Sequence, residues 1–193
     1  MLSPNPSDLE NLTAASTRAQ LAMLTDRWQT KGLDAPYQVG PGSLEWLIEG
    51  LHSCNLFSWH ADDKSRAAQP DGVLMQHKRD LDASNLMRSR FMEAIDLTVA
   101  DVLQLRPRQD LGGLYVNSET VGQIIDRLSV MTLKHHFLSR RLNGLEVSET
   151  LQRVDDQLFY VSYCMDKFLK ALLQGKAQML AYRQFKTYQP PES

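Results

Sequence analysis

The stretch NSETVGQIIDRLSVMTLK (residues 117–134) decides the fold of this chain. It begins with a cluster of capping residues and then places charged residues, Asp126 and Arg127 among them, between apolar neighbours. A charge among apolar residues is costly to bury unless it meets a partner. Two other segments offer such partners, NLFSWHADDKSR (55–66) and HKRDLDASNLMR (77–88). The sequence therefore predicts a polar centre inside a helical bundle.

Helical spacing of apolar residues runs through most of the chain, and Ser, Asp, Gly and Pro bound the periodic segments. There is no alternating pattern of a length that predicts a strand, no repeat, and no shift in composition that marks a second domain. The expected fold is all-α: one domain (1–193), an antiparallel bundle of about five helices with a short C-terminal tail that begins as a short helix. The expected helices span residues 7–30, 43–66, 71–105, 118–142 and 147–174, and the tail spans 176–193.

Composition excludes several classes of protein. The 193 residues contain 42% hydrophobic and 23% charged residues, with a net charge of −2, as in an ordinary soluble domain. This balance gives no general attraction to nucleic acid or to an anionic membrane. The N-terminus lacks the pattern of a secretory signal, and no apolar run approaches the roughly 20 residues that span a bilayer. We therefore expect a soluble cytoplasmic protein.

The two cysteines, Cys54 and Cys164, lie far apart and form no CxxC pair. Each stands in a helical pattern beside apolar residues, which predicts two buried free thiols in a reducing compartment. A disulfide and a catalytic thiol are the alternative interpretations.

Polar residues repeat at helical spacing on three consecutive expected helices. A solvated face produces any one such stripe, and Lys78 with Asp82 is an ordinary surface pair. Three stripes of mixed sign on neighbouring helices favour a shared interior network, which would be either structural or part of a binding site. The residues expected there are Asn55, Trp59, His60, Asp63 and Arg66 in the second helix, Lys78, Asp82, Asn85 and Arg88 in the third, and Thr120, Asp126, Arg127 and Lys134 in the fourth.

Arg127 lies between Ile125 and Leu128 in the sequence. We expect it to be largely buried and paired with a carboxylate of another helix, Asp63 or Asp82.

His60 and Asp63 are the candidates for proton transfer if the protein is an enzyme, with Asp63 backing His60. Their spacing also lets both face one metal ion, whereas a histidine within a structural network is the third interpretation. The Glu-x-x-His pairs of bundle di-metal sites are missing, and His135 and His136 diverge by about 100° on a helix. The chain also lacks a nucleophile elbow, a P-loop, a dinucleotide fingerprint and a paired-cysteine zinc pattern. The sequence predicts no metal site and no cofactor.

Four blocks of sequence occur in a characteristic order: LHSCNLFSWHADDKSR (51–66), HKRDLDASNLMR (77–88), NSETVGQIIDRLSVMTLKHH (117–136) and YRQFKTY (182–188). Together they resemble the bacterial family called domain of unknown function 4254, from about residue 51 to residue 188. The resemblance implies an all-helical cytoplasmic module without a settled activity, often encoded near genes for surface-polysaccharide assembly and glycosyltransferases. The family usually has Glu where this chain has Asp62, which puts in doubt any role that needs the longer carboxylate.

Two functional hypotheses follow, one for each interpretation of the polar stripes, and the sequence leaves open whether any reaction is catalysed. In the first, the centre binds a phosphate-bearing small molecule such as a sugar nucleotide. Its donors are Arg66, Lys78, Arg88, Arg127 and Lys134, with Asn55 and Asn85 orienting the ligand, Trp59 stacking on a ring, and Asp82 and Asp126 beside them. In the second, the protein is a non-catalytic accessory or scaffold protein that binds a glycosyltransferase or itself, with 182–188 as an interaction arm.

Overall fold

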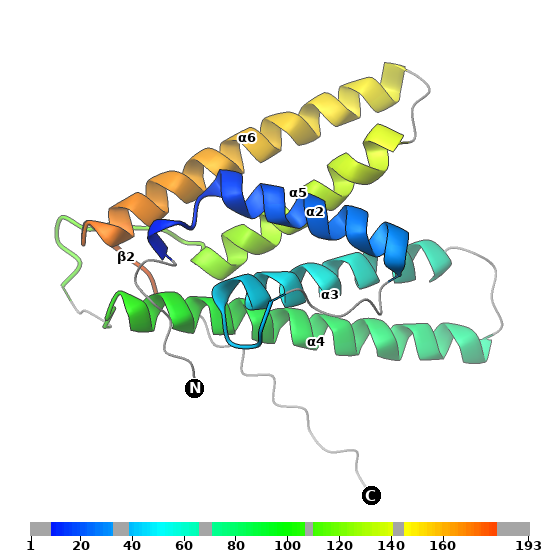
Figure 1. The fold of residues 1–193 in the computed structure, drawn as a ribbon, viewed down its shortest axis with the longest axis horizontal. Coiled ribbons are helices and arrows are strands. Elements are labelled where there is room, and N and C mark those ends of the chain that lie inside the picture. Colours follow the sequence, from blue (N-terminus) through cyan, green and yellow to red (C-terminus); the bar gives the residue numbers. More distant parts are fainter. Residues whose placement is uncertain (1–8, 33–38, 66–70, 107–109, 141–144, 181–193) are drawn as a thin grey trace, which may run out of the picture.

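The computed structural model describes residues 9–32, 39–65, 71–106, 110–140 and 145–180, with the side chains of 63–65, 71, 145 and 146 excepted. Within these ranges the chain forms helices α2 (Ala14–Lys31), α3 (Leu44–Ser65), α4 (Asp71–Val102), α5 (Val121–Arg140) and α6 (Leu145–Leu173) (Figure 1). The only strands there are β1 (Tyr115–Val116) and β2 (Ala177–Gln178). The prediction of an all-α fold is confirmed. None of the described helices is long and apolar enough to cross a membrane.

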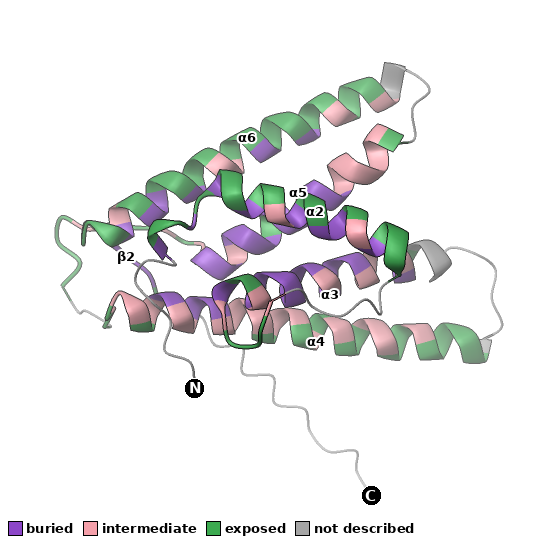
Figure 2. Cartoon of the chain, viewed as in Figure 1, coloured by how far each residue is buried: buried purple, intermediate pink, exposed green. Residues whose placement is uncertain are grey.

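Helix α5 is the central helix of the bundle, because it packs against each of the other four. Its buried face carries Ile124, Ile125 and Leu128 together with the polar residues Asp126 and Ser129. Figure 2 shows buried residues along the sides of α3 and α5 that face the other helices. Helix α6 and the first half of α4 are exposed along their outer sides. Residues 121–133 therefore supply much of the core, and the polar side chains of Asp126 and Ser129 are buried with it.

Capping boxes, in which two residues three apart each accept the other's backbone N–H, set the starts of α2 and α5. At α2 the Thr13 hydroxyl accepts the Ser16 N–H at 3.1 Å and the Ser16 hydroxyl accepts the Thr13 N–H at 3.0 Å. The prediction of one helix over 7–30 is therefore wrong in its continuity, because residues 9 and 10 are helical, residues 11–13 are not, and the long helix begins at Ala14. At α5, Thr120 and Gln123 form the same arrangement, so that this helix begins at Val121 and not at residue 118.

The chain reverses after α6. Gly175 has a φ of +66°, which favours glycine, and the Lys176 N–H donates to the Ala171 carbonyl at 2.8 Å. The strand β2 then pairs in parallel with β1, with Tyr115 opposite Ala177 and Val116 opposite Gln178. The short helix expected in the tail and the YRQFKTY arm both lie outside the described residues.

Two helical glycines allow α4 to approach its neighbours closely. A Cβ atom on Gly122 of α5 would lie 2.5 Å from the Met92 carbonyl oxygen of α4, and one on Gly50 of α3 would lie 2.3 Å from the Phe91 ring. Real Cβ atoms do not approach other atoms so closely. The positions of α3 and α5 against α4 therefore depend on residues without a side chain.

Candidate functional site

A buried chain of hydrogen bonds links four helices at the centre of the bundle. Asn55 of α3 donates through Nδ2 to Asp126 Oδ1 and to Ser129 Oγ of α5, each at 2.9 Å. His52, one turn before Asn55, contacts Ser129 Oγ through Nδ1 at 2.7 Å and Thr25 Oγ1 of α2 through Nε2 at 2.8 Å. Arg88 of α4 donates to both carboxylate oxygens of Asp126. We call these six residues the polar chain: Thr25, His52, Asn55, Arg88, Asp126 and Ser129.

The donors and acceptors of the polar chain fix the protonation of His52. The Thr25 hydroxyl donates its hydrogen to the Leu21 carbonyl at 2.8 Å, so it accepts from His52 Nε2. Ser129 accepts from Asn55, which leaves its own hydrogen to donate to Nδ1 of a neutral His52. His52 is thus the neutral tautomer with its hydrogen on Nε2. Complete burial agrees with this assignment, because desolvation lowers the pKa of His52 to about 3.

The ion pair between Arg88 and Asp126 closes the other end of the polar chain. Arg88 Nε donates to Asp126 Oδ1 at 2.7 Å and Nη2 donates to Oδ2, a bidentate arrangement. The hydrogen bonds to Asp126 raise the pKa of Arg88 above its ordinary value, although partial burial lowers it. The Asp126 side chain is 10% exposed and that of Arg88 is 32% exposed. The carboxylate is therefore the more deeply buried partner, and its negative charge depends on the positive charge of Arg88 for neutralisation.

The polar chain contains three of the residues that the sequence predicted for the centre, Asn55, Arg88 and Asp126. Lys78, Asp82 and Asn85 lie exposed on the first half of α4, and Lys134 is half-buried near the end of α5. The predicted polar residues in the first half of α4 therefore lie on its surface, because only the second half of this long helix packs in the core. Arg66 and the side chain of Asp63 lie outside the described part of the structure, so the predicted His60–Asp63 pair stays a prediction.

The prediction for Arg127 is wrong. Its side chain is 56% exposed and pairs with Glu119, just before α5, at 3.1 Å. Adjacent residues on a helix point about 100° apart, so the burial of Asp126 turns Arg127 toward solvent. Ile125 and Leu128 flank Arg127 in the sequence but belong to the buried face of α5.

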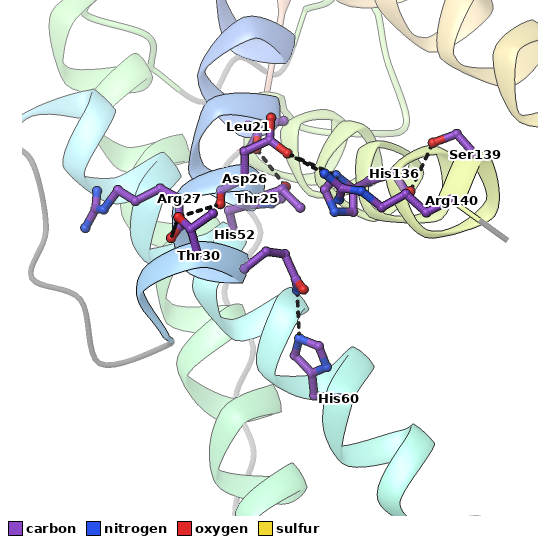
Figure 3. A network of polar contacts seen from close by, with 11 residues as sticks. Leu21, Thr25, Asp26, Arg27, Thr30, His52, His60, His136, Ser139 and Arg140 are labelled. Atoms are coloured by element: carbon purple, nitrogen blue, oxygen red, sulfur yellow. Dashed lines mark hydrogen bonds and ion pairs between the residues drawn. The ribbon is translucent and has the colours of Figure 1, made fainter.

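Trp59 and His60 lie nearer the end of α3, against Phe137 of α5. The Trp59 ring stacks on Phe137 with centroids 5.0 Å apart, and His60 meets the edge of Phe137 at 5.7 Å. His60 Nε2 is 3.2 Å from the amide nitrogen of Gln29 on α2, from which it accepts a hydrogen bond (Figure 3). Trp59 and His60 thus contribute to packing between helices, outside the polar chain.

Figure 3 also shows a more exposed group that joins α2 to the end of α5. Arg140 donates to Asp26 Oδ1 at 3.0 Å and to His136 Nδ1 at 2.8 Å. Burial, and then the nearby guanidinium of Arg140, lower the pKa of His136, although Asp26 acts in the opposite direction. His136 is therefore neutral near pH 7, and this group resembles a surface link between helices.

Three members of the polar chain, Thr25, His52 and Ser129, were not predicted. Spacing gave a usable signal for two of them: His52 is three residues before Asn55, and Ser129 is three residues after Asp126, so each pair shares a helix face. Small hydroxyl residues occur widely inside helices, and this made Thr25 and Ser129 inconspicuous. A buried ion pair of Arg27 with Glu49 at 2.9 Å, between α2 and α3, was also missed.

Cys54 is buried as predicted, and burial raises the pKa of its thiol. Cys164 contradicts the prediction, because it lies exposed on α6 as a free thiol. It points away from Met165 and Phe168, which occupy the core side of that helix.

Asp96 of α4 binds the start of α5 and was not predicted. Its carboxylate accepts the Gly122 N–H at 2.7 Å, beside the capping residue Thr120. Burial raises the pKa of Asp96 to about 6, although hydrogen bonds from Thr120 and Gly122 act in the opposite direction. Burial thus lowers the pKa of His52 and raises that of Asp96 relative to the unfolded chain, and either difference makes the free energy of unfolding depend on pH.

We expect His52 to reduce stability as the solution becomes acidic. Its pKa is about 3 in the folded protein and about 6.5 in the unfolded chain, so the unfolded chain binds an extra proton between these values. The free energy of unfolding should therefore fall by up to about 1.4 kcal/mol for each pH unit below 6.5 from this residue alone. Urea unfolding of the wild type and of His52→Gln between pH 5 and pH 7 measures this contribution as the difference in their slopes.

Asp96→Asn serves as the control with the opposite sign. The pKa of Asp96 is about 6 when folded and lies near 4 when unfolded, so the folded protein holds the extra proton and its advantage over Asp96→Asn falls as the pH rises through 6. If the free energy of unfolding changed equally with pH in the wild type and in His52→Gln, the assignment of a neutral, buried His52 would be contradicted.

Two grooves in the described part of the structure lie away from the polar chain. One of about 380 Å³ lies between α2 and the start of α3, lined by Leu12, Thr17 and Ile48 among others. Another of about 430 Å³ lies between α2, α5 and α6, beside Ala19 and His135. Neither is lined by a member of the polar chain. Among the described side chains, no three metal-ligating groups gather around a common point.

Comparison with known proteins identifies the family. Residues 45–180 match the model of the family described as "Protein of unknown function (DUF4254)", so this chain belongs to that family. The match includes every member of the polar chain except Thr25. No curated protein and no solved structure matches the chain.

Proposed function

We propose that this member of the family is a non-catalytic accessory or scaffold protein of the bacterial cytoplasm. It would bind a glycosyltransferase or a second copy of itself during surface-polysaccharide assembly. One observation carries the proposal: both ring nitrogens of His52 and both carboxylate oxygens of Asp126 already bond to other groups of the same chain. The polar chain therefore resembles a device that fixes the positions of helices, as buried polar networks do in some proteins.

The arrangement of cations supports the same proposal. An anion site needs several donors that converge on one point. Arg88 is bound by Asp126 and Arg127 by Glu119, whereas Lys78 is exposed near the start of α4. Of the predicted phosphate-binding residues, these three are therefore separated from one another. The hypothesis of a phosphate-bearing ligand stays a prediction, and the experiment below distinguishes it from a scaffold.

For a scaffold we expect no response to phosphate-bearing metabolites. A ligand that binds only the folded state at ten times its Kd adds about 1.4 kcal/mol to stability, which raises the melting temperature measurably. Inorganic phosphate, nucleotides, sugar phosphates and sugar nucleotides at millimolar concentration should leave the melting temperature of the wild type unchanged. A thermal-shift assay measures this directly.

Lys134→Met and His60→Gln provide the matched controls for this assay. A metabolite that stabilises the wild type but not Lys134→Met would contradict the scaffold and restore the ligand hypothesis, because this change removes a donor and keeps most of the side-chain volume. Loss of a turnover in His60→Gln would further identify an enzyme, since glutamine cannot titrate. Recovery of the same glycosyltransferase by the wild type and by the double variant would support the scaffold.

A further inference from the structure

The outer face of α6 carries a cluster of exposed aromatic rings. Phe159, Tyr160 and Tyr163 are 64%, 66% and 55% exposed, and the first two rings lie 5.6 Å apart. Helix α6 lies at one edge of the bundle, and its outer side is exposed along most of its length (Figure 2). Contiguous apolar patches on a protein surface mark sites of association. We call the exposed side of residues 149–170 the α6 face.

Charges on the α6 face change sign along the helix. The first half has exposed carboxylates at Glu149 and Asp156 against the single cation Arg153, whereas the last turns have Lys167 and Lys170. Asp155 lies 3.4 Å from His135 of α5 and so is directed to its own bundle. One further carboxylate in the last turns, Asp166, accepts the Ala14 N–H at the start of α2 and so is directed to its own bundle. The face is thus acidic before the aromatic cluster and basic after it. A second copy turned end for end has the complementary distribution.

Helical geometry determines which residues of two antiparallel α6 helices lie opposite each other. A two-fold axis between Tyr160 and Tyr163 places Tyr160 of one copy at the height of Tyr163 of the other, and Asp156 at the height of Lys167. Residues eleven apart in an α-helix differ by only about 20° around its axis, so Asp156 and Lys167 lie on one line along the face. Arg153 and Lys170 also come to one height, but they are about 100° apart around the helix and point to opposite edges.

We propose that two copies of this chain associate through their α6 faces in an antiparallel, two-fold symmetric dimer. The six aromatic rings form its centre, and an Asp156–Lys167 ion pair flanks them on each side. This inference rests on the proposed function, because it names a second copy as the partner of the scaffold. Self-complementary two-fold interfaces are the commonest kind in soluble oligomers.

The expected affinity is moderate. Six rings that are each more than half exposed remove on the order of 600 Å² from water, and the flanking residues bring the total near the lower limit of stable interfaces, about 1,200 Å². The wild type should therefore be in a monomer–dimer equilibrium at micromolar concentration. Salt should weaken the dimer, since ion pairs at its edges are screened.

The test uses charge reversal and sedimentation velocity on the full chain. Asp156→Lys places two lysines opposite each other, and Lys167→Glu places two carboxylates opposite each other, so each variant alone should be monomeric where the wild type dimerises. An equimolar mixture of the two variants should form a heterodimer, because each then meets the opposite charge. Asp101→Lys, an exposed reversal on α4, is the matched control and should dimerise like the wild type.

Native thiols give a second readout. Cys164 lies beside the aromatic cluster and is exposed, whereas Cys54 is buried. A short bismaleimide should link two wild-type chains through Cys164, and Cys164→Ser should prevent the product. A wild type that stays monomeric at high micromolar concentration would overturn the inference. A dimer that both charge reversals leave intact would do the same, because it would use another surface.

Failure of the dimer and failure of the proposed function are distinguishable. A monomeric protein that no metabolite stabilises remains a scaffold for another protein. A metabolite that stabilises a dimeric protein overturns the scaffold and leaves the α6 interface in place.

Discussion

Arg88→Met should lower the free energy of unfolding by about 3–5 kcal/mol, the range observed when one partner of a buried ion pair is removed. The substitution keeps most of the side-chain volume but leaves Asp126, whose side chain is 10% exposed, without a cation. Asn55 still donates to Asp126, which does not compensate a full charge. Urea unfolding at neutral pH, followed by circular dichroism, measures the loss.

Arg127→Met is the matched control for this prediction. Arg127 is adjacent in sequence to Asp126 and also pairs with a carboxylate, but its side chain is 56% exposed. Exposed ion pairs contribute roughly 0–1 kcal/mol, so this variant should be nearly as stable as the wild type. Equal losses in Arg88→Met and Arg127→Met would show that burial does not distinguish the two arginines.

Gly122→Ala should lower the free energy of unfolding by at least about 2 kcal/mol, even though alanine favours helices by about 1 kcal/mol over glycine. The added Cβ would lie 2.5 Å from the Met92 carbonyl oxygen and 3.0 Å from the Asp96 carboxylate. A backbone carbonyl cannot turn aside as a flexible side chain does, so α4 and α5 must separate. That separation also weakens the hydrogen bond from the Gly122 N–H to Asp96. Thermal and urea unfolding both measure the effect.

Gly72→Ala provides the comparison. Gly72 is also helical, but a Cβ atom there meets nothing within 4 Å. This variant should be as stable as the wild type or slightly more stable. A Gly122→Ala protein that is also unchanged or stabilised would contradict the close approach of α4 and α5.

The sequence predicted the helical architecture because its signals are local. The spacing of apolar residues and the Gly and Pro residues between segments act within a few residues of each boundary. Four of the expected helices agree with the structure to within a few residues at each described end, those at 43–66, 71–105, 118–142 and 147–174. The expected first helix was continued through Thr13 because apolar spacing does not show that Thr13 and Ser16 form a capping box, which starts a new helix there.

The hydrogen-bonded residues of the core overlap the predicted polar centre only at Asn55, Arg88 and Asp126. Arg88 and Arg127 both stand among apolar residues, and a linear pattern does not show which of two adjacent residues on α5 faces the core. The burial of Asp126 settles this by directing Arg127 outward. The hydroxyls of Thr25 and Ser129 carry no charge and form no conspicuous stripe, yet they fix the tautomer of His52. Such neutral links depend on contacts between helices, which spacing along one helix does not reveal.

We propose that the polar chain holds the bundle together and does not serve a ligand. A double-mutant cycle with Arg88→Met, Asp126→Ala and the double variant, followed by urea unfolding, tests it most directly. We expect each single variant to lose stability, and the double variant to lose less than their sum by at least about 2 kcal/mol, because it leaves no uncompensated charge. Losses that add to within about 0.5 kcal/mol, or single variants as stable as the wild type, would contradict the account, since residues kept for ligand binding contribute little to stability or reduce it.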